Sequence, residues 1–175
     1  VRYRFEPIDV GELVRSTADE FQQEGAERGR RVELRTDGEL PAIRADREAL
    51  TRALWNLLDN AVKYSPGSPK VWVEVAREQH GVAITVRDSG LGIAPEEQKQ
   101  IYRKFFRGSA AKAADIKGTG IGLAMVQHIV QAHGGKMRLE SAPGIGSTFT
   151  VVLPAGRSNL ASSNPATNHD THSHS

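Results

Sequence analysis

Apolar residues recur at helical spacing in two stretches of the first half of the chain. The first stretch follows Asp9, which has the side chain of a helix N-cap with Glu12 three residues later, and it ends at Gly25. The second follows Asp46 and ends in the turn-forming run 64–69. Each pattern predicts an amphipathic helix. The apolar faces would consist of Val10, Leu13, Val14, Thr17 and Phe21 in the first helix and of Leu50, Leu54, Leu57, Leu58 and Ala61 in the second.

Shorter runs that alternate between apolar and polar residues, or that are rich in β-branched residues, predict strands. Two further helical segments are expected, a short one from Pro95 to Tyr102 and a longer one from Thr119 to His133. The order of the elements predicts an α+β fold, a two-layer sandwich in which about three helices cover one face of a mixed, largely antiparallel sheet. The strands are expected at residues 32–35, 41–44, 71–75, 82–86, 136–140 and 147–153.

The composition divides the chain into one domain and a polar end. Residues 1–154 contain all the predicted helices and strands, which a chain of 175 residues can arrange around a single core. Within this domain, residues 108–117 lack a bulky apolar stripe and predict a mobile loop. Residues 155–175 consist mainly of Ser, Asn, Ala, Thr and His, so this end is expected to be disordered.

Charge and composition narrow the class of protein. The 23 Lys and Arg residues nearly balance the 21 Asp and Glu residues, with no long block of one sign, which argues against a nucleic-acid-binding surface. The absence of cysteine excludes disulfides and thiolate metal sites. The sequence has no run of 18 apolar residues, so no direct membrane contact is predicted. The first residues of the sequence contain neither an initiator Met nor a signal peptide. The chain is therefore expected to be a soluble part of a longer protein, and the absence of cysteine is compatible with a cytoplasmic location.

Three polar residues on the second predicted helix form a face of their own. Asn56, Asn60 and Lys63 are spaced i, i+4 and i+7, so they project from one side of the helix, away from its apolar stripe. Asparagine is unfavourable inside helices, so the two asparagines indicate a role other than helix stability. An amide oxygen suits Mg²⁺, and a lysine neutralises phosphate charge. The face predicts a metal and phosphate site, with a merely solvated polar face as the alternative.

Two glycine-rich segments lie downstream of this helix. Residues 118–122 contain three glycines ahead of a predicted helix, whose N-terminal N–H groups would receive an anion. An ordinary tight loop is the alternative, whereas a dinucleotide-binding fingerprint would require a preceding strand that is not predicted here. Asp88 follows a predicted strand and precedes Gly90 and Gly92. Its carboxylate could accept a hydrogen bond from the exocyclic amine of a base, or it could stabilise its own turn.

In combination these motifs resemble the catalytic, ATP-binding domain of bacterial sensor histidine kinases. That domain belongs to the GHKL superfamily, which also includes the ATPase domains of gyrase and of heat-shock chaperones, and the resemblance implies the GHKL fold. It covers residues of about 5–154, with the ATP lid at about residues 107–117. The matching motifs are the N box at 56–64, the glycine boxes at 88–93 and 118–123, the F box at 105–107 and the closing turn at 144–149.

The resemblance implies a role for each matched residue. Asn60 would bind Mg²⁺, Asn56 would lie near the same phosphates, and Lys63 would contact phosphate. Arg107 would reach the γ-phosphate of ATP during transfer, where positive charge stabilises the transition state. Other nucleotide contacts would come from Tyr64, from Asp88 at the adenine amino group, from Thr148 through a water, from Gly90, Gly92 and Ile93 around the base, and from Gly118, Thr119, Gly120, Ile121, Gly122 and Leu123 at the phosphates.

The resemblance also implies which reaction follows ATP binding. Superfamily members that hydrolyse ATP have a Glu where this chain has Asn56, and an amide cannot act as a general base. Slow hydrolysis and transfer of the phosphoryl group to a histidine are therefore expected. The acceptor would lie on the dimerisation domain of a homodimeric parent kinase, docked on the side of Phe105 and Phe106, with a response regulator further downstream. The isolated chain is expected to be monomeric.

None of the six histidines heads a phosphoacceptor pattern of the type His-Glu-x-x-Thr or His-Asp-x-x-Thr on a predicted dimerisation helix. The chain alone is therefore expected to bind ATP without phosphorylating itself. Two alternatives stay open: a serine kinase of the anti-sigma type, and a catalytically inactive module that changes shape on nucleotide binding. The segments 5–10 and 105–107 argue against the first, and the complete set of phosphate and metal positions argues against the second.

Overall fold

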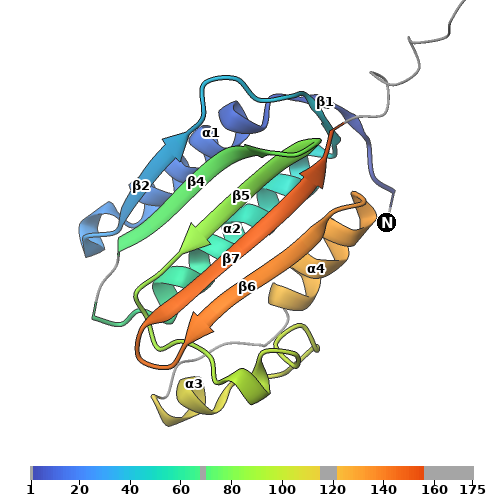
Figure 1. The fold of residues 1–175 in the computed structure, drawn as a ribbon. Helices are drawn as coiled ribbons and strands as arrows, with labels where there is room; N and C mark the ends of the chain where they lie inside the picture. The colour runs from blue at the N-terminus through green and yellow to red at the C-terminus, as the bar shows by residue number, and fades with distance from the viewer. Residues whose placement is uncertain (1, 68–69, 115–121, 156–175) are drawn as a thin grey trace, which may run out of the picture.

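The structure, a computed structural model, describes residues 2–67, 70–114 and 122–155. The helices are α1 (Val10–Glu24), α2 (Arg47–Lys63), α3 (Ser109–Ala113) and α4 (Gly122–Ala132), with 3-10 turns η1 (Ala26–Arg28) and η2 (Pro95–Glu97). The strands are β1 (Glu6–Ile8), β2 (Arg31–Thr36), β3 (Ile43–Ala45), β4 (Lys70–Glu78), β5 (Gly81–Arg87), β6 (Lys136–Ala142) and β7 (Gly146–Pro154). Helices α1, α2 and α4 lie against one face of a five-stranded sheet, and β1 and β3 form a small sheet of their own (Figure 1).

Both long N-terminal helices begin where the sequence predicts. The Asp9 side chain accepts a hydrogen bond from the Glu12 amide at 3.1 Å, and the Asp46 side chain accepts one from the Ala49 amide at 2.9 Å. These bonds satisfy amide groups that have no partner inside the helix. Helix α1 ends at its C-cap, Gly25, and α2 ends at Tyr64, so the amphipathic pattern and its boundaries are confirmed.

The large sheet has the strand order β2-β4-β5-β7-β6. Strands β2 and β4 are parallel and the other neighbours are antiparallel, which confirms a mixed, largely antiparallel sheet. The extended segment near residue 43 does not join this sheet. It forms β3 and pairs with β1, a strand that the sequence pattern does not predict, with Ile8 opposite Ile43.

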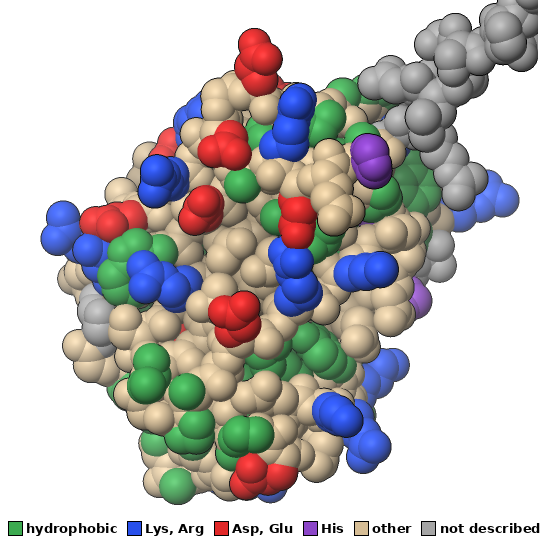
Figure 2. All heavy atoms as spheres, viewed as in Figure 1, with side chains coloured by type: hydrophobic (Ala, Val, Ile, Leu, Met, Phe, Trp, Pro, Cys, Tyr) green, Lys and Arg blue, Asp and Glu red, His purple; other side chains and the backbone are tan. Residues whose placement is uncertain are grey.

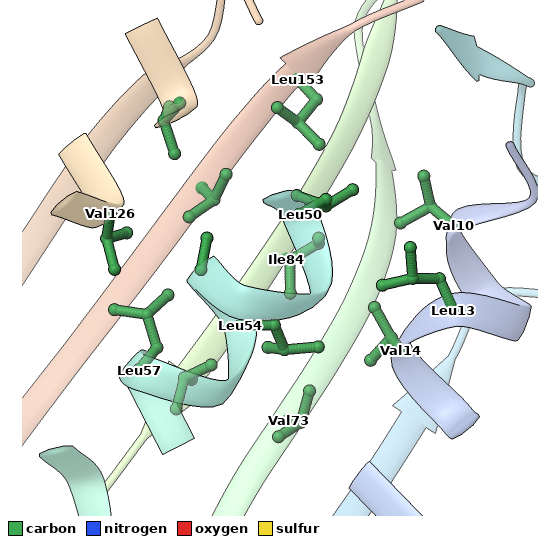
Figure 3. Packing of buried hydrophobic residues seen from close by; sticks show 14 of the residues in the cluster. Val10, Leu13, Val14, Leu50, Leu54, Leu57, Val73, Ile84, Val126 and Leu153 are labelled. Carbon is green, nitrogen blue, oxygen red and sulfur yellow. The ribbon is translucent and has the colours of Figure 1, made fainter. Parts of the chain in front are cut away.

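The core lies between the sheet and the helices. Figure 3 shows Val10, Leu13 and Val14 of α1 and Leu50, Leu54 and Leu57 of α2 directed toward side chains of the strands, among them Val73 and Ile84. Val126 adds the contribution of α4. Because alternate residues of a strand face opposite sides, Ser147, Phe149, Val151 and Leu153 of β7 face the helices and are buried.

The other face of the sheet carries mixed charges (Figure 2). Two cations lie over the ring of Trp72 there, with Arg87 Cζ 4.4 Å and Lys70 Nζ 5.1 Å from the ring centroid. Lys70 also forms an ion pair with Glu33 at 2.9 Å. In the part of the chain that the structure describes, no helix is long and apolar enough to cross a membrane.

Two short segments differ from the sequence prediction. The predicted helix from Pro95 to Tyr102 is only the three-residue turn η2, followed by further turns. Part of the predicted loop 108–117 is instead α3, in which Ala111 is buried. Alanine is the strongest helix former, so a run of alanines can form a helical turn without the bulky apolar stripe used to recognise helices. Residues 115–117 and the polar end from 156 onward lie outside the described residues.

Candidate functional site

A pocket opens between the C-terminal half of α2, the loop after β5, the segment from η2 to α3, and the start of α4. Of the residues proposed from the sequence, seven line it, and they come from four separate parts of the chain. The complete lining is Asn60, Tyr64, Asp88, Leu91, Gly92, Ile93, Glu97, Ile101, Phe106, Arg107, Gly108, Ala110, Ala111, Leu123, Ser147 and Phe149. This lining is mostly apolar, with a few polar groups, as is usual for small-molecule sites.

Asp88 is the buried carboxylate of this pocket, with 8% of its surface exposed. Its Oδ1 accepts hydrogen bonds from the Gly90 amide at 2.9 Å and the Ser147 amide at 3.2 Å. Burial raises the pKa of Asp88, and the two amides lower it in part. The amides also hold the carboxyl group in one orientation. Oδ2 accepts no hydrogen bond from the described residues. Because Oδ1 is held by the two amides, Oδ2 is available in a fixed position to accept a hydrogen bond from a ligand.

The loop that follows Asp88 is packed tightly against the end of α2. The Leu91 amide donates to the Tyr64 carbonyl oxygen at 3.0 Å. A Cβ on Gly90 would lie 2.1 Å from the same oxygen, so only glycine allows the two backbones to come this close. The glycine therefore has a structural role in joining two walls of the pocket.

A group of polar side chains, which the sequence reasoning missed, holds the far end of this loop. The Ile93 amide donates to Ser141 Oγ at 2.8 Å, and Ser141 Oγ lies 2.8 Å from Ser147 Oγ. Gln98 Nε2 donates to the Ile93 carbonyl at 3.0 Å and to the Ser141 carbonyl at 3.2 Å. These bonds fix the loop to β6 and β7. No local sequence signal links residues so far apart along the chain.

Three predicted residues provide the polar side of the pocket. Asn60 is partly exposed, and its side-chain amide makes no hydrogen bond with a described residue. Burial raises the pKa of Tyr64, whereas the positive charge of Arg107 lowers it and the negative charge of Asp59 raises it further. Arg107, Tyr64 and Asn60 all line the same pocket.

Other predicted residues lie beside the pocket or outside the described part of the chain. Asn56 Nδ2 donates to the Arg52 carbonyl at 2.9 Å, and Asn56 Oδ1 would lie 3.1 Å from a Cβ on Gly122, the first residue of α4. Gly90, Lys63 and Gly122 are also absent from the pocket lining, whereas Leu123 belongs to it. Gly118, Thr119, Gly120 and Ile121 lie outside the described residues.

The resemblance implies that Thr148 contacts the nucleotide, but Thr148 does not line the pocket. Strand alternation places Thr148 on the sheet face opposite the helices, while its neighbours Ser147 and Phe149 line the pocket. A shift of one residue along a strand moves a side chain to the other face, so a motif match that is one residue off selects the wrong side. Ser147 is the hydroxyl residue of β7 that lies next to Asp88.

The two phenylalanines of the segment 105–107 have different environments. Phe105 is 71% exposed and has a positive φ of 66°, whereas Phe106 packs against the core and lines the pocket. The sequence predicts a partner surface on the side of both residues. In Figure 2, hydrophobic side chains also gather at the end of the molecule where α3 lies.

Residues 45–157 match the family described as histidine kinase-, DNA gyrase B-, and HSP90-like ATPases. The chain belongs to this family. Among its relatives is the sensor-like histidine kinase SenX3 of Mycobacterium tuberculosis, with 42% identity over 125 residues. That alignment covers 71% of this chain and 30% of SenX3, so the chain spans about a third of the relative's length.

Solved structures of histidine kinases have the same fold as this ATPase-family domain. The catalytic domain of histidine kinase ThkA gives a TM-score of 0.72 at 27% identity, covering 86% of this chain and 95% of that one. Full-length ShkA, solved in complex with AMPPNP, gives a TM-score of 0.75 at 27% identity. It covers 89% of this chain and 32% of that one. The predicted GHKL fold is confirmed.

We expect Asp88→Asn to stabilise this ATPase-family domain relative to wild type as the pH rises. The pKa of Asp88 is raised above its ordinary 3.8, so the folded protein holds the proton more tightly than the unfolded chain does. The protonated Asp88 carboxyl stabilises the folded protein fully below about pH 3.8, the pKa in the unfolded chain. This contribution is lost as the pH rises through the pKa of Asp88 in the folded protein. The asparagine side chain of the variant cannot ionise, and its oxygen can accept the same two amide hydrogen bonds.

Urea unfolding of both proteins at pH 4 and pH 7 measures this difference. The free energy of unfolding of Asp88→Asn minus that of wild type should be larger at pH 7. A difference that stays constant or becomes smaller between these pH values would show that burial does not dominate the pKa of Asp88.

Proposed function

We propose that this chain is the catalytic domain of a sensor histidine kinase, which binds ATP with Mg²⁺ and transfers the γ-phosphoryl group to a histidine of a separate dimerisation domain. The observation that carries the proposal is the buried carboxylate of Asp88, fixed by two amides in the wall of a mainly apolar pocket. The family and the AMPPNP complex of the similar protein ShkA support ATP as the ligand.

Asp88 and Ser147 would recognise the adenine ring. A carboxylate oxygen in a fixed orientation accepts a hydrogen bond from the exocyclic amino group of adenine, which guanine lacks at that position. The Ser147 hydroxyl, held next to Ser141, would help to hold the same edge of the base. Gly92, Ile93 and Leu123, with the apolar residues Ile101, Phe106 and Phe149, would surround the ring.

The side chain of Asn60 fits a role in binding Mg²⁺. Its amide has no hydrogen bond to a described residue, and its oxygen is a neutral, hard donor. Mg²⁺ is usually held by one or two protein ligands together with phosphate oxygens and waters, and here it would neutralise phosphate charge. Within residues 2–67, 70–114 and 122–155, no group of three or more His, Cys, Asp or Glu residues could hold a metal alone. The metal would therefore bind together with the nucleotide.

Arg107, Lys63 and Asn56 would act on the phosphates. Arg107 would place its charge at the γ-phosphate, Lys63 would neutralise phosphate charge near the end of α2, and Asn56 would lie next to the start of α4. Residues 118–121 would contribute backbone N–H groups at the phosphates. Because Asn56 is neutral, it cannot activate water, which favours transfer to histidine over hydrolysis.

The acceptor and partners would belong to the parent kinase. Its dimerisation domain would dock on the side of Phe105, which is 71% exposed, and the phosphoryl group would pass on to a response regulator. The parent would be a homodimer with this domain in the cytoplasm, and the chain alone would be a monomer that does not phosphorylate itself. The similarity to histidine kinases favours histidine over the serine acceptor of an anti-sigma-type kinase and over an inactive module.

Titration of a fluorescent ATP analogue against wild type and Asn60→Ala tests this site. In Mg²⁺ we expect the variant to bind about tenfold more weakly, a loss of about 1.4 kcal/mol, because one metal ligand is lost. In EDTA the two proteins should bind equally. Arg52→Ala, an exposed change one turn before Asn56 on α2, is the matched control. Equal affinities in Mg²⁺ would remove Asn60 from the metal site.

The transfer step is tested by adding the dimerisation domain of the same parent. We expect acid-labile phosphohistidine to form on that domain when wild type and MgATP are present. Acid-stable phosphoserine, or no phosphorylation despite nucleotide binding, would overturn the kinase assignment.

A further inference from the structure

We propose that Glu97 is a positioning residue for Arg107, which it holds in place by anchoring the backbone of Ser109. The inference rests on the proposed function, because Arg107 acts on the phosphate only if the pocket binds ATP. Both Glu97 and Arg107 line the pocket. Glu97 belongs to the turn η2, 12 residues before Ser109, and none of the sequence motifs includes it.

The geometry shows how the anchor works. The Ser109 amide lies 3.0 Å from Glu97 Oε1 and 3.3 Å from Oε2, so the carboxylate accepts its hydrogen bond with both oxygens within reach. Ser109 is the first residue of α3, so its amide has no partner inside the helix, and the N-cap, Gly108, makes no side-chain hydrogen bond. A Cβ on Gly108 would lie 3.2 Å from Glu97 Oε2, which places the chain close to the carboxylate. Glu97 therefore provides the acceptor for this first helical amide.

Arg107 lies between two fixed points. Phe106 precedes it, packs against the core, and donates its amide to the Arg103 carbonyl at 3.2 Å. Ser109 follows it by two residues and is fixed by Glu97. If the second point is lost, the backbone after Arg107 is held less firmly, although the pocket residues on α2, β5 and β7 remain in place. The expected effect is a misplaced guanidinium group and an intact base site.

Ser109→Pro removes the donor of this hydrogen bond with little other disturbance. Proline is favoured at the first position of a helix, where its fixed φ is suitable and the missing N–H is not needed for the helix. Gly108 has φ −65° and ψ 154°, a conformation that residues before proline adopt readily. Ser109→Ala keeps the amide and is the matched control. On the acceptor side, Glu97→Ala removes the carboxylate, and Glu97→Gln keeps an oxygen that can accept.

We expect Glu97→Ala and Ser109→Pro to lower the rate of phosphoryl transfer to the added dimerisation domain about tenfold or more, since small misplacements of catalytic groups are costly. Their affinity for ADP and their melting temperature should stay at the wild-type level. Glu97→Gln and Ser109→Ala should transfer phosphate at close to the wild-type rate. A loss of ADP affinity and melting temperature along with the rate would overturn the proposal, because it would show a general structural role.

Hydrogen exchange of the Ser109 amide reports the anchor without any nucleotide. The Glu97 carboxylate accepts the hydrogen bond of this amide, so the amide should exchange more slowly in wild type and in Glu97→Gln than in Glu97→Ala. NMR measures the exchange, and the Gly90 amide, which donates to Asp88, is the internal control. Equal exchange of the Ser109 amide in wild type and Glu97→Ala would overturn the proposal. If wild type fails to bind ATP, the proposed function fails, and the exchange of the Ser109 amide then decides whether Glu97 anchors this backbone.

Discussion

Gly92→Ala is expected to lower the free energy of unfolding by about 3 kcal/mol or more and to weaken nucleotide binding with it. Gly92 has a φ of +70°, a conformation that costs a residue with a side chain about 1–2 kcal/mol. A Cβ there would also lie 2.0 Å from the Ala142 carbonyl oxygen, which belongs to β6 and cannot turn away as a side chain can. The loop would have to separate from the strand, and Gly92 itself lines the pocket.

Gly144→Ala separates these two causes. Gly144 has a φ of +77°, but nothing lies within 4 Å of the position that its Cβ would take. It should therefore show only the conformational cost, about 1–2 kcal/mol, and a nearly normal ATP affinity. Urea unfolding and nucleotide titration of both variants give the comparison. Equal losses of stability would mean that the approach of Gly92 to β6 contributes nothing.

Arg107→Ala is expected to lower phosphoryl transfer by about 10³-fold, because a positioned arginine stabilises the charge that develops on the phosphoryl group. Affinity for ADP, which has no γ-phosphate, should change little. The reaction is followed as phosphohistidine formed on the added dimerisation domain. Arg107→Lys should recover only part of the rate, since an ammonium group lacks the planar fork of guanidinium.

Arg103→Ala is the matched control for Arg107→Ala, because Arg103 is exposed, lies four residues earlier and is not part of the pocket lining. Equal rates for Arg107→Ala and wild type would remove Arg107 from the catalytic group. Equal losses for Arg103→Ala and Arg107→Ala would point to docking of the acceptor domain as the common cause.

The helices and most strands follow from local patterns. Asp9 and Asp46 cap their helices as predicted, and the alternating residues of β4 and β7 bury one face each. These signals are local, because a cap needs a partner only three residues away and a strand repeats every two residues. Strand β1 was missed since three residues carry too short a pattern, and its partner β3 lies more than thirty residues later.

The site could be predicted in part. Asn60 and Asp88 were predicted as site residues, and both line the pocket. Asn60 could be recognised because it lies on a polar helix face, and Asp88 because a carboxylate precedes two glycines. Thr148 was selected in place of Ser147, since a motif contains no information on which face of β7 meets the helices. Glu97 and Ser141 were missed, as their partners lie 12 and 48 residues away in the sequence.

By itself, the sequence determined the class of fold, the faces of α1 and α2, and the residue types that serve a nucleotide and a metal, because helix and strand periods and side-chain chemistry are local properties. The tertiary structure alone decided that Asp88 is buried against the amides of Gly90 and Ser147, that Ser147 faces the pocket, and that Glu97 holds Ser109. Each of these depends on burial or on a hydrogen bond between distant segments. Such contacts form only when the sheet, the helices and their connecting loops pack together.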